Sequence, residues 1–344
     1  MLHCSVNPAS IATLYDLGQD IDSAPRSLSL LFTMHIARPP VTLPPSVRVF
    51  ERGWLSSNNI LVQDVHHAAL IDSGYCSHSD QTVALVKNAL AGQALDLLLN
   101  THLHSDHCGG NAALQAAYPA LQTQIPPGLA HAVQPWTPSQ LSFDATGQSC
   151  PPFHIDATLQ PGSTLTLGGL EWQVHAAPGH DPHSVVIFAP QARLLISADA
   201  LWENGFGVVF PELEGEDAFD EVGATLDLIE DLKPLTVIPG HGAPFIAVTQ
   251  ALETARKRLD YFQRQPERHR NYAAKVLLKF KLLEQQSMHV DSLVEWAVST
   301  SYMKQMATSV QGAGSERALV LDWLAQLVQA GAAEQDGDQV RNRD

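Results

Sequence analysis

The sequence predicts a layered α/β sandwich followed by a mostly helical C-terminal module. Three observations predict this class. Short apolar runs of strand length alternate with amphipathic helical stretches between residues 47 and 242. The predicted strands outnumber the helices among them, which favours a layered sandwich over a doubly wound parallel sheet. Beyond Val248 the pattern changes to amphipathic helix almost throughout.

The predicted domain boundaries follow these changes of pattern. With 344 residues the chain is longer than one hydrophobic core usually extends, so we expect one large and one smaller domain. Residues 1–42 lack periodicity and form a predicted N-terminal extension, either loosely attached, with Met34 as an alternative first residue, or an ordered arm. Residues 43–248 form the predicted catalytic domain and residues 249–344 the smaller one.

The first half of the large domain begins with three short predicted strands between turn signals: 46–53, 58–65 and 67–74. An amphipathic helix over 81–92 ends at a glycine. The continuous apolar run 95–100 predicts a strand buried on both faces, and a helix follows over 111–119. Residues 121–163 are rich in Pro, Gln and Ser, and such a long segment commonly borders an active site.

The second half contains four more predicted strands: 164–169, 170–179, 184–190 and 192–199. A helix over 218–232 and a strand over 235–242 complete the domain. Four amphipathic helices are then predicted: 251–265, 267–286, 290–298 and 316–331. Because residues 331–340 have the turn chemistry of a small β-wing, the C-terminal domain is predicted to be helical and winged-helix-like.

The strongest chemical signal is the sequence HLHSDH, which directly follows the apolar run 95–100. It contains His102, His104, Asp106 and His107, a density far beyond chance clustering. Imidazole and carboxylate are the ligand types that suit zinc and related divalent ions. Since a loop at the end of a strand can turn several side chains toward one point, the motif predicts a metal site.

Three further segments repeat this arrangement of buried strand, small-residue turn and ligand-type side chain. His180 lies in APGH, Asp199 ends LLISAD, and His241 lies in VIPGHG. Gly and Pro at such turns let the backbone bend sharply and hold the ligand rigidly. One ion needs four or more ligands, so these residues extend the predicted metal site.

The complete set resembles the signature of the metallo-β-lactamase superfamily: HxHxDH, then a lone His, a lone Asp and a lone His. The resemblance covers about residues 45–246 and fills every ligand position of the two-metal form. It implies an αββα sandwich with the site at one edge of two packed sheets. It also implies that one ion is held by His102, His104 and His180, and the other by Asp106, His107 and His241, with Asp199 bridging both.

Two metal ions in one site predict hydrolytic chemistry. Divalent ions about 3.5–4 Å apart can share a hydroxide whose parent water has a pKa lowered toward about 7, and this hydroxide attacks a carbonyl carbon or a phosphorus. We therefore expect two divalent ions, zinc first, with manganese or iron as alternatives. Asp106 and Asp199 are the predicted catalytic residues.

Two residues outside the ligand set are candidates for supporting roles. Asp72 in ALIDSG resembles the family carboxylate that hydrogen-bonds around the ligand loop, the alternative being a simple turn aspartate. His183 either faces the pocket and binds substrate or is a loop histidine without a role.

Three departures from family patterns bear on the substrate. Ala198 stands where the family more often has glycine, a change that we expect to preserve ligation. After His180 the chain has DPHS instead of a second PGH-like turn, which weakens the case for a glutathione thioester. The bridging residue is an aspartate, whereas many true β-lactamases use cysteine, so an antibiotic-cleaving role is not expected.

A basic stretch follows the large domain. Nine of the twenty Lys and Arg residues lie between residues 254 and 281, where only two acidic residues oppose them, which gives a local charge of +7 (nine minus two). The candidates for anion binding are Arg256, Lys257 and Arg258, with RNA, a CoA or glutathione thioester or a phosphorylated small molecule as ligand. The alternative is a solvated helix face that balances an acidic body.

The bulk composition restricts partners and location. A net charge of −16 predicts a surface that repels nucleic acid and anionic membranes as a whole. No apolar run approaches the roughly 20 residues of a membrane span. Four cysteines without a CxxC pair favour a reducing compartment, so a cytoplasmic location is expected. The expected partner is a small-molecule substrate, and the oligomeric state stays open.

Three functional hypotheses follow. The leading one is a binuclear metal-dependent hydrolase that uses a metal-bridging hydroxide on a small ester, thioester or lactone. The second is an RNA-cutting phosphodiester hydrolase that docks RNA on the basic C-terminal helices. The third is a non-catalytic metal-binding interaction module, against which the complete ligand set argues.

Overall fold

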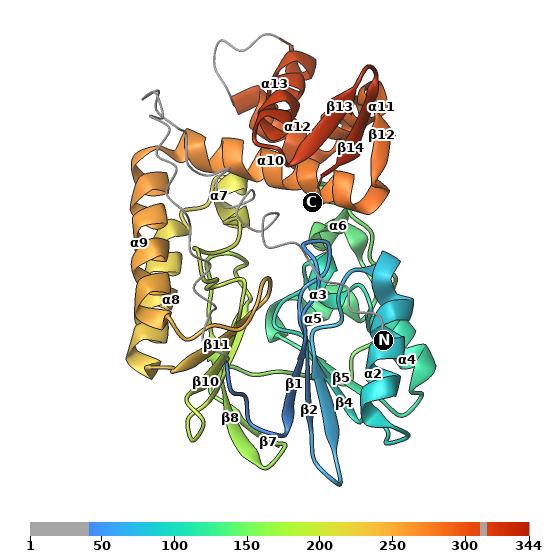
Figure 1. Cartoon of the computed structure of the whole chain (residues 1–344), viewed down its shortest axis with the longest axis vertical. Coiled ribbons are helices and arrows are strands. Elements are labelled where there is room, and N and C mark those ends of the chain that lie inside the picture. Colours follow the sequence, from blue (N-terminus) through green and yellow to red (C-terminus); the bar gives the residue numbers. More distant parts are fainter. Residues whose placement is uncertain (1–40, 310–314, 344) are drawn as a thin grey trace, which may run out of the picture.

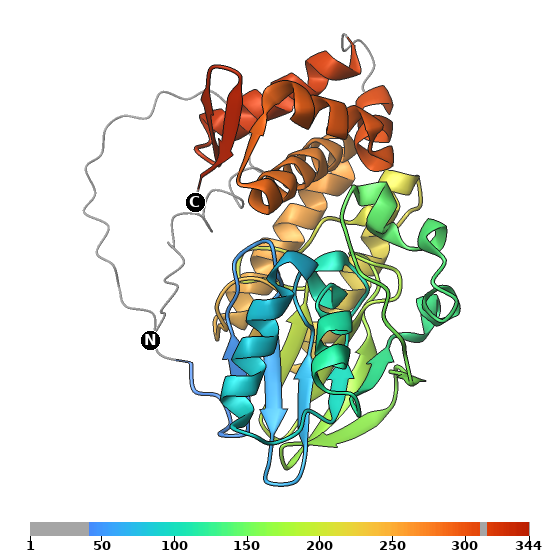
Figure 2. The same ribbon diagram turned by 90° about the vertical axis from the view of Figure 1, so that its right-hand side faces the viewer.

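The computed structural model describes residues 41–309 and 315–343. The predicted N-terminal extension therefore lies almost wholly outside the described residues. Figures 1 and 2 show two sheets packed face to face, helices on their outer faces, and the C-terminal helices across one end. Among the described residues, no helix combines the length and apolar character that a membrane span requires.

The first sheet has six strands in sequence order: β1 (Val47–Phe50), β2 (Asn59–Gln63), β3 (Ala68–Ile71), β4 (Leu97–Leu99), β5 (Gln122–Ile125) and β6 (Ala157–Thr158). The first three strands pair antiparallel, and the pairs from β3 to β6 are parallel. Parallel strands carry their carboxyl ends to the same edge of a sheet, so the loops after β3, β4 and β5 lie at one edge.

The second sheet has the strand order β11-β10-β9-β8-β7. Its strands are β7 (Thr164–Leu167), β8 (Leu170–Ala176), β9 (Val185–Ala189), β10 (Leu194–Ala198) and β11 (Thr236–Pro239). All pairs are antiparallel except β10 with β11, which is parallel. The parallel pair brings the ends of β10 and β11 together.

The period of two along each strand divides its side chains between two cores. Ile60 and Ile71 join Trp172 and Ile187 between the sheets. Leu61 and its outward-facing neighbours instead pack against α2 (Ser79–Leu90) and α4 (Asn111–Ala117). On the other side α8 (Phe219–Leu232) and α9 (Val248–Arg264) cover the second sheet. This arrangement confirms the predicted αββα sandwich.

Short elements fill the connections: η1 (Cys76–His78), α3 (Ser105–Cys108), η2 (Pro127–Leu129), α5 (Ala130–Val133), η3 (Pro138–Gln140), α6 (Ser142–Thr146) and α7 (Phe210–Glu214). Several of them, with β5 and β6, lie in the segment 121–163, for which the sequence predicted no regular element. β5 has the sequence QTQI, whose polar residues hide a strand from hydrophobic periodicity.

The C-terminal module is helical with a small sheet, as predicted. Its elements are α10 (Pro266–Gln285), β12 (Ser287–His289), α11 (Val290–Ser299), α12 (Ser301–Ser309), α13 (Glu316–Gln329), β13 (Ala333–Asp336) and β14 (Gln339–Asn342). The sheet has the order β12-β14-β13, and β13 with β14 forms the expected wing. One continuous core joins this module to the outer face of the second sheet, and the boundary at residue 248 stays a prediction.

Candidate metal centre

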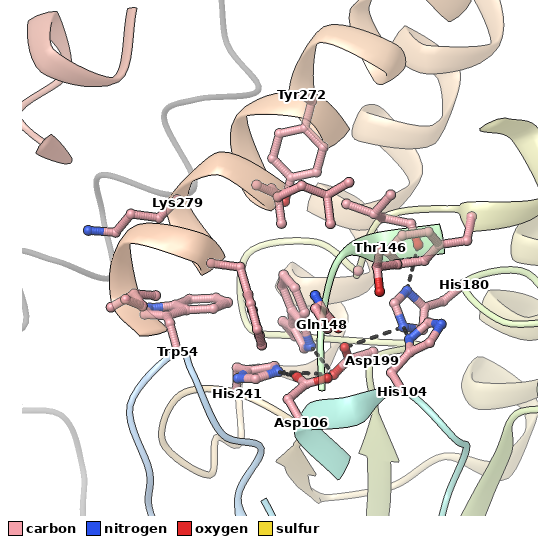
Figure 3. Close-up of a pocket in the computed structure, with 18 residues that line it drawn as sticks. Trp54, His104, Asp106, Thr146, Gln148, His180, Asp199, His241, Tyr272 and Lys279 are labelled. Atoms are coloured by element: carbon pink, nitrogen blue, oxygen red, sulfur yellow. Dashed lines mark hydrogen bonds and ion pairs between the residues drawn. The ribbon is translucent and has the colours of Figure 1, made fainter. Parts of the chain in front are cut away.

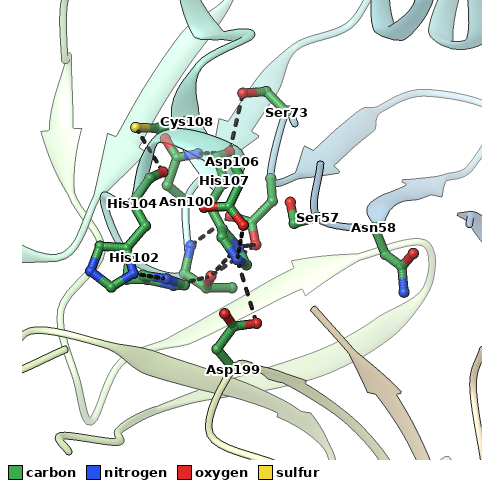
Figure 4. A network of polar contacts seen from close by, with 12 residues as sticks. Ser57, Asn58, Ser73, Asn100, His102, His104, Asp106, His107, Cys108 and Asp199 are labelled. Atoms are coloured by element: carbon green, nitrogen blue, oxygen red, sulfur yellow. Dashed lines mark hydrogen bonds and ion pairs between the residues drawn. The ribbon is translucent and has the colours of Figure 1, made fainter. Parts of the chain in front are cut away.

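The seven predicted ligands come from four loops at one edge of the sandwich. His102 and His104 lie between β4 and α3, and Asp106 and His107 lie in α3 itself. The remaining three follow the ends of β8, β10 and β11: His180, Asp199 and His241. All seven side chains are buried, and the structure brings all seven together (Figures 3 and 4).

Three imidazoles form the first group of donor atoms. His104 Nδ1 lies 3.1 Å from His102 Nε2 and 2.8 Å from His180 Nε2, and the two Nε2 atoms are 3.3 Å apart. His180 is oriented by its other nitrogen, which donates a 2.5 Å hydrogen bond to the Val208 carbonyl. That bond leaves the lone pair of His180 Nε2 facing the other two nitrogens.

The second group consists of Asp106, His107, Asp199 and His241. His241 Nε2 lies 3.0 Å from Asp106 Oδ2, and His107 Nε2 lies 3.5 Å from Asp199 Oδ1. His107 Nε2 is buried and has no hydrogen-bond partner in the part of the chain described. A buried ring nitrogen of this kind, facing two carboxylates, fits a divalent cation at that point.

Asp199 lies between the two groups. Its Oδ1 is 3.5 Å from His107 Nε2, and its Oδ2 is 3.4 Å from His180 Nε2. One carboxylate thus faces both sets of nitrogens, as a ligand shared by two ions must. Trp202 Nε1 donates to Asp199 Oδ1 at 3.1 Å and helps to fix the orientation of the carboxylate.

Burial sets the protonation of the first group. It lowers the pKa of His102 well below the ordinary value, lowers that of His104 to about 4, and also lowers that of His180. The three imidazoles are therefore neutral at pH 7, the form that binds metal. For Asp199 burial acts to raise the pKa, but nearby imidazoles, His107 first, hold it well below its ordinary value.

Asp72 lies where it can orient His107. Its Oδ2 accepts from His107 Nδ1 at 2.8 Å, and its two oxygens also accept from the backbone N–H and the hydroxyl of Thr101. The bond directs the Nδ1–H of His107 to Asp72 and leaves Nε2, the nitrogen that a metal ion would bind, facing Asp199. This is the contact that the sequence predicted for Asp72.

Close packing explains the glycines of the ligand turns. A side chain at Gly240 would overlap Asp199 Oδ1, and one at Gly207 would overlap the ring of His180. Ala198, by contrast, is an alanine at a position that favours glycine. Its φ of 46° lies in the left-handed region of backbone conformation. The position therefore carries strain that the family's commoner residue would avoid.

Several residues around the site were not predicted. Trp54 stacks on His241 with ring centroids 5.1 Å apart and an angle of 8° between the planes. Asp181 Oδ2 lies 3.8 Å from His104 Nε2, and Asn58 donates to the carbonyls on both sides of the His241 turn. Only Asp181 had a sequence signal, since it directly follows His180.

Unlike Asp72, the other predicted supporting residues lie apart from the seven ligand-type side chains. His183 is exposed, packs over Gly128, and borders a neighbouring hollow. Arg256 on α9 donates to Asp227 and Glu230 of α8. Lys257 is exposed on the same helix, and Arg258 lies over the Tyr272 ring and donates to the Phe206 carbonyl. Their roles in binding an anion stay predictions.

The metal-ligand side chains open into a pocket of about 710 Å³, counted to its open mouth. Trp54, Trp202 and Phe210 border it from the sandwich, and Thr146 and Gln148 border it from the segment 121–163. The opposite wall is helix α10 (Figure 3).

Comparison with known proteins places the site in context. The family model described as the metallo-beta-lactamase superfamily matches residues 52–241. A hydroxyacylglutathione hydrolase from Anaeromyxobacter dehalogenans is 33% identical over 199 residues, which cover 56% of this chain and 66% of that protein. One from Brucella anthropi is 27% identical over 161 residues, covering 45% and 47%. The chain thus spans about half to two thirds of the length of these relatives.

A solved structure extends the likeness to the C-terminal module. A metallo-beta-lactamase family protein from Thermus thermophilus matches with a TM-score of 0.53 and 19% identity. The match covers 88% of this chain and all of the other. At this identity the likeness establishes the fold alone.

Proposed function

This chain belongs to the metallo-β-lactamase superfamily of metal-dependent hydrolases, and we propose that it uses two divalent ions to hydrolyse the acyl bond of a small ester, thioester or lactone. The observation that supports the proposal most is the position of Asp199, whose two oxygens face two separate groups of buried donors. The names of the curated relatives favour a thioester among these substrates.

The proposed ligand sets follow the two groups. His102, His104 and His180 would hold one ion, Asp106, His107 and His241 the other, and Asp199 both. Zinc suits this set of imidazoles and carboxylates, as do manganese and iron. Bound divalent ions supply Lewis acidity, which polarises a carbonyl oxygen and lowers the pKa of water toward about 7.

The protein's own groups prepare the site for this chemistry. Asp72 holds His107 in one tautomer, and the Val208 carbonyl does the same for His180. Trp54 covers one face of His241 and keeps bulk water from it. With its pKa held low, Asp199 stays a carboxylate through the working pH range and accepts the bond from Trp202.

The RNA-cutting alternative finds less support. Of the basic stretch, Arg256 is paired with two carboxylates of α8, Lys281 is paired with Glu284, and Lys279 donates to three oxygens of the C-terminal segment. Cations engaged in this way offer less charge to a phosphate backbone. RNA cleavage is therefore included in the test below as the result that would favour this alternative.

The test is a screen of zinc-loaded protein against uncharged acyl thioesters, aryl esters, lactones, a phosphodiester and single-stranded RNA. We expect turnover of acyl substrates, bound metal close to two ions per chain by elemental analysis, and loss of both turnover and metal in His104→Ala. His66→Ala, which removes an exposed histidine of the β2–β3 turn, is the matched control and should behave as wild type. Cleavage of RNA with every acyl substrate left intact would overturn the proposal.

A further inference from the structure

One face of helix α10 closes the pocket opposite the metal-ligand residues. Tyr272, Val276, Phe280 and Leu283 of this helix border the pocket. Their spacing of four, four and three residues places them on one stripe of the helix. We call these four residues the apolar wall.

Three residues of the apolar wall are less buried than the core residues of the helix, whereas Tyr272 also belongs to the packed core. Ala274, Leu278 and Leu282 are fully buried among the helices of the C-terminal module. By contrast, Val276 and Leu283 are only partly buried, although they are equally apolar. Accessible apolar side chains inside a cavity that also contains a polar reaction site are typical of contacts with an apolar part of a ligand.

The wall is held in place by contacts with the sandwich. The Phe280 ring meets Tyr75 edge-on, with centroids 5.1 Å apart. The Tyr75 hydroxyl donates to Glu284 at 2.6 Å and accepts from the Ser149 N–H at 3.1 Å. Since Tyr75 is fully buried, the wall has a fixed position relative to the metal-ligand residues.

Among the described residues, the side chains around the pocket offer little positive charge to an anionic ligand group. Of the described residues that border it, Lys279 is the one with a cationic side chain. Its ammonium turns away, as Figure 3 shows, and donates to Ala332 O, Asn342 Oδ1 and Arg343 O. The neighbouring hollow, which shares His104 and Phe210 with the pocket, is bordered among described residues by carboxylates and no Lys or Arg: Asp181, Glu214 and Glu216.

From these observations we propose that the acyl group of the substrate is an uncharged aliphatic chain that lies along Val276, Phe280 and Leu283. Its carbonyl carbon then faces Asp199 and the other donors across the pocket. The inference rests on the proposed acyl hydrolysis and narrows it to hydrophobic acyl esters or thioesters. A glutathione or CoA portion with several anionic groups finds no available cation in either hollow.

The test compares straight-chain acyl thioesters of N-acetylcysteamine, from acetyl to octanoyl, with S-lactoylglutathione. Burial of each added CH₂ should raise kcat/KM by about fourfold until the chain fills the pocket. Val276→Trp, which fills the space beside the wall, should abolish this gain. Val65→Trp is the matched control, because Val65 is 88% exposed in the β2–β3 turn.

A binding measurement keeps this inference separate from the activity itself. We expect calorimetry to detect octanamide binding that is weakened about tenfold or more by Val276→Trp, is weakened by Leu283→Ala as well, and is unchanged in Val65→Trp. Equal turnover of acetyl and octanoyl thioesters, or a clear preference for S-lactoylglutathione, would overturn the apolar-chain inference and leave acyl hydrolysis standing. Failure of every acyl substrate would overturn the hydrolysis proposal. Absence of octanamide binding, or binding that Val276→Trp leaves unchanged, would overturn the role of the apolar wall.

Discussion

The two walls of one pocket differ in almost every physical respect. The metal wall, which consists of the seven predicted ligands, is built at the ends of strands. Its side chains are buried; Asp72 and the Val208 carbonyl accept hydrogen bonds from two of its imidazoles, and Trp202 donates one to Asp199. The apolar wall is a single helical face on which Val276, Phe280 and Leu283 stay partly accessible. In our proposals the metal wall determines the reaction and the apolar wall selects the substrate.

The walls are nevertheless joined at a single short segment. Val208 accepts from His180 of the metal wall, and the next residue, Val209, donates its N–H to His269 Nε2 of α10 at 3.0 Å. Helix α10 therefore supports the residue that orients a predicted ligand. A change in one wall is expected to reach the other through this segment, and four predictions test how far the division holds.

The largest effect should come from the shared carboxylate. Asp199→Ala removes a group that faces both donor sets, so we expect kcat/KM to fall by about 1,000-fold or more, equivalent to about 4 kcal/mol of transition-state stabilisation. Circular dichroism should show an intact fold. Asp231→Ala, at an exposed site on α8, serves as the control. Near-normal turnover in Asp199→Ala would show that the reaction does not depend on the metal wall.

A smaller effect is expected at Asp72, which contacts the predicted ligand His107 and is not itself a predicted ligand. Asp72→Asn keeps an oxygen acceptor for Thr101 but removes the charge that holds His107, and we expect zinc affinity or activity to fall by about 10- to 100-fold. Competition with a chromogenic chelator measures the affinity. Asp96→Asn alters a carboxylate that accepts from Ala68 at the far end of β3 and should leave zinc affinity unchanged; equal losses in both variants would contradict the orienting role.

The stability of the protein should depend on pH through His269, which bonds the segment between the two walls. Burial lowers the pKa of His269 to about 3, whereas an unfolded histidine titrates near 6.5. Between these values the unfolded state binds the extra proton, so stability falls as pH falls, by about 1.4 kcal/mol per pH unit from this group. His269→Gln, which keeps an acceptor for Val209, should reduce the pH slope of denaturant-measured stability between pH 6.5 and 4.5 by about 1.4 kcal/mol per pH unit. An unchanged slope would argue against a neutral buried imidazole.

The smallest effect concerns the strained turn of the metal wall. Ala198→Gly should relieve a left-handed backbone and raise the free energy of unfolding by up to about 1 kcal/mol, with metal content unchanged. The same substitution at Ala84, an exposed position within α2, should lower it by about 1 kcal/mol. Equal losses in the two variants, measured by urea unfolding, would show that residue 198 is unstrained.

The two walls also differ in how far the sequence predicts them. The metal wall is local in sequence: HLHSDH and three strand-end turns each carry their own signal, and the structure brings all seven residues together. The sandwich was likewise predicted, because continuous apolar runs such as residues 60–62 indicate strands that are buried on both faces. Short polar strands such as Gln122–Ile125 carry no such signal.

The apolar wall was not predicted, because its function depends on partners far away in sequence. Within α10 the lysines and apolar residues suggested a basic face, but the Lys279 ammonium donates hydrogen bonds to oxygens more than fifty residues later. Arg256 finds its carboxylates on α8. Similarly, nothing near Trp54 in the sequence indicates that its ring stacks on His241, almost two hundred residues away.

The central claim is that two groups of donors, joined by Asp199, hold two divalent ions. A crystal structure of zinc-loaded protein with data collected above and below the zinc absorption edge tests it most directly. We predict two anomalous peaks, one among His102, His104 and His180 and one among Asp106, His107 and His241, each in contact with Asp199. A single peak, or peaks outside these groups, would contradict the account.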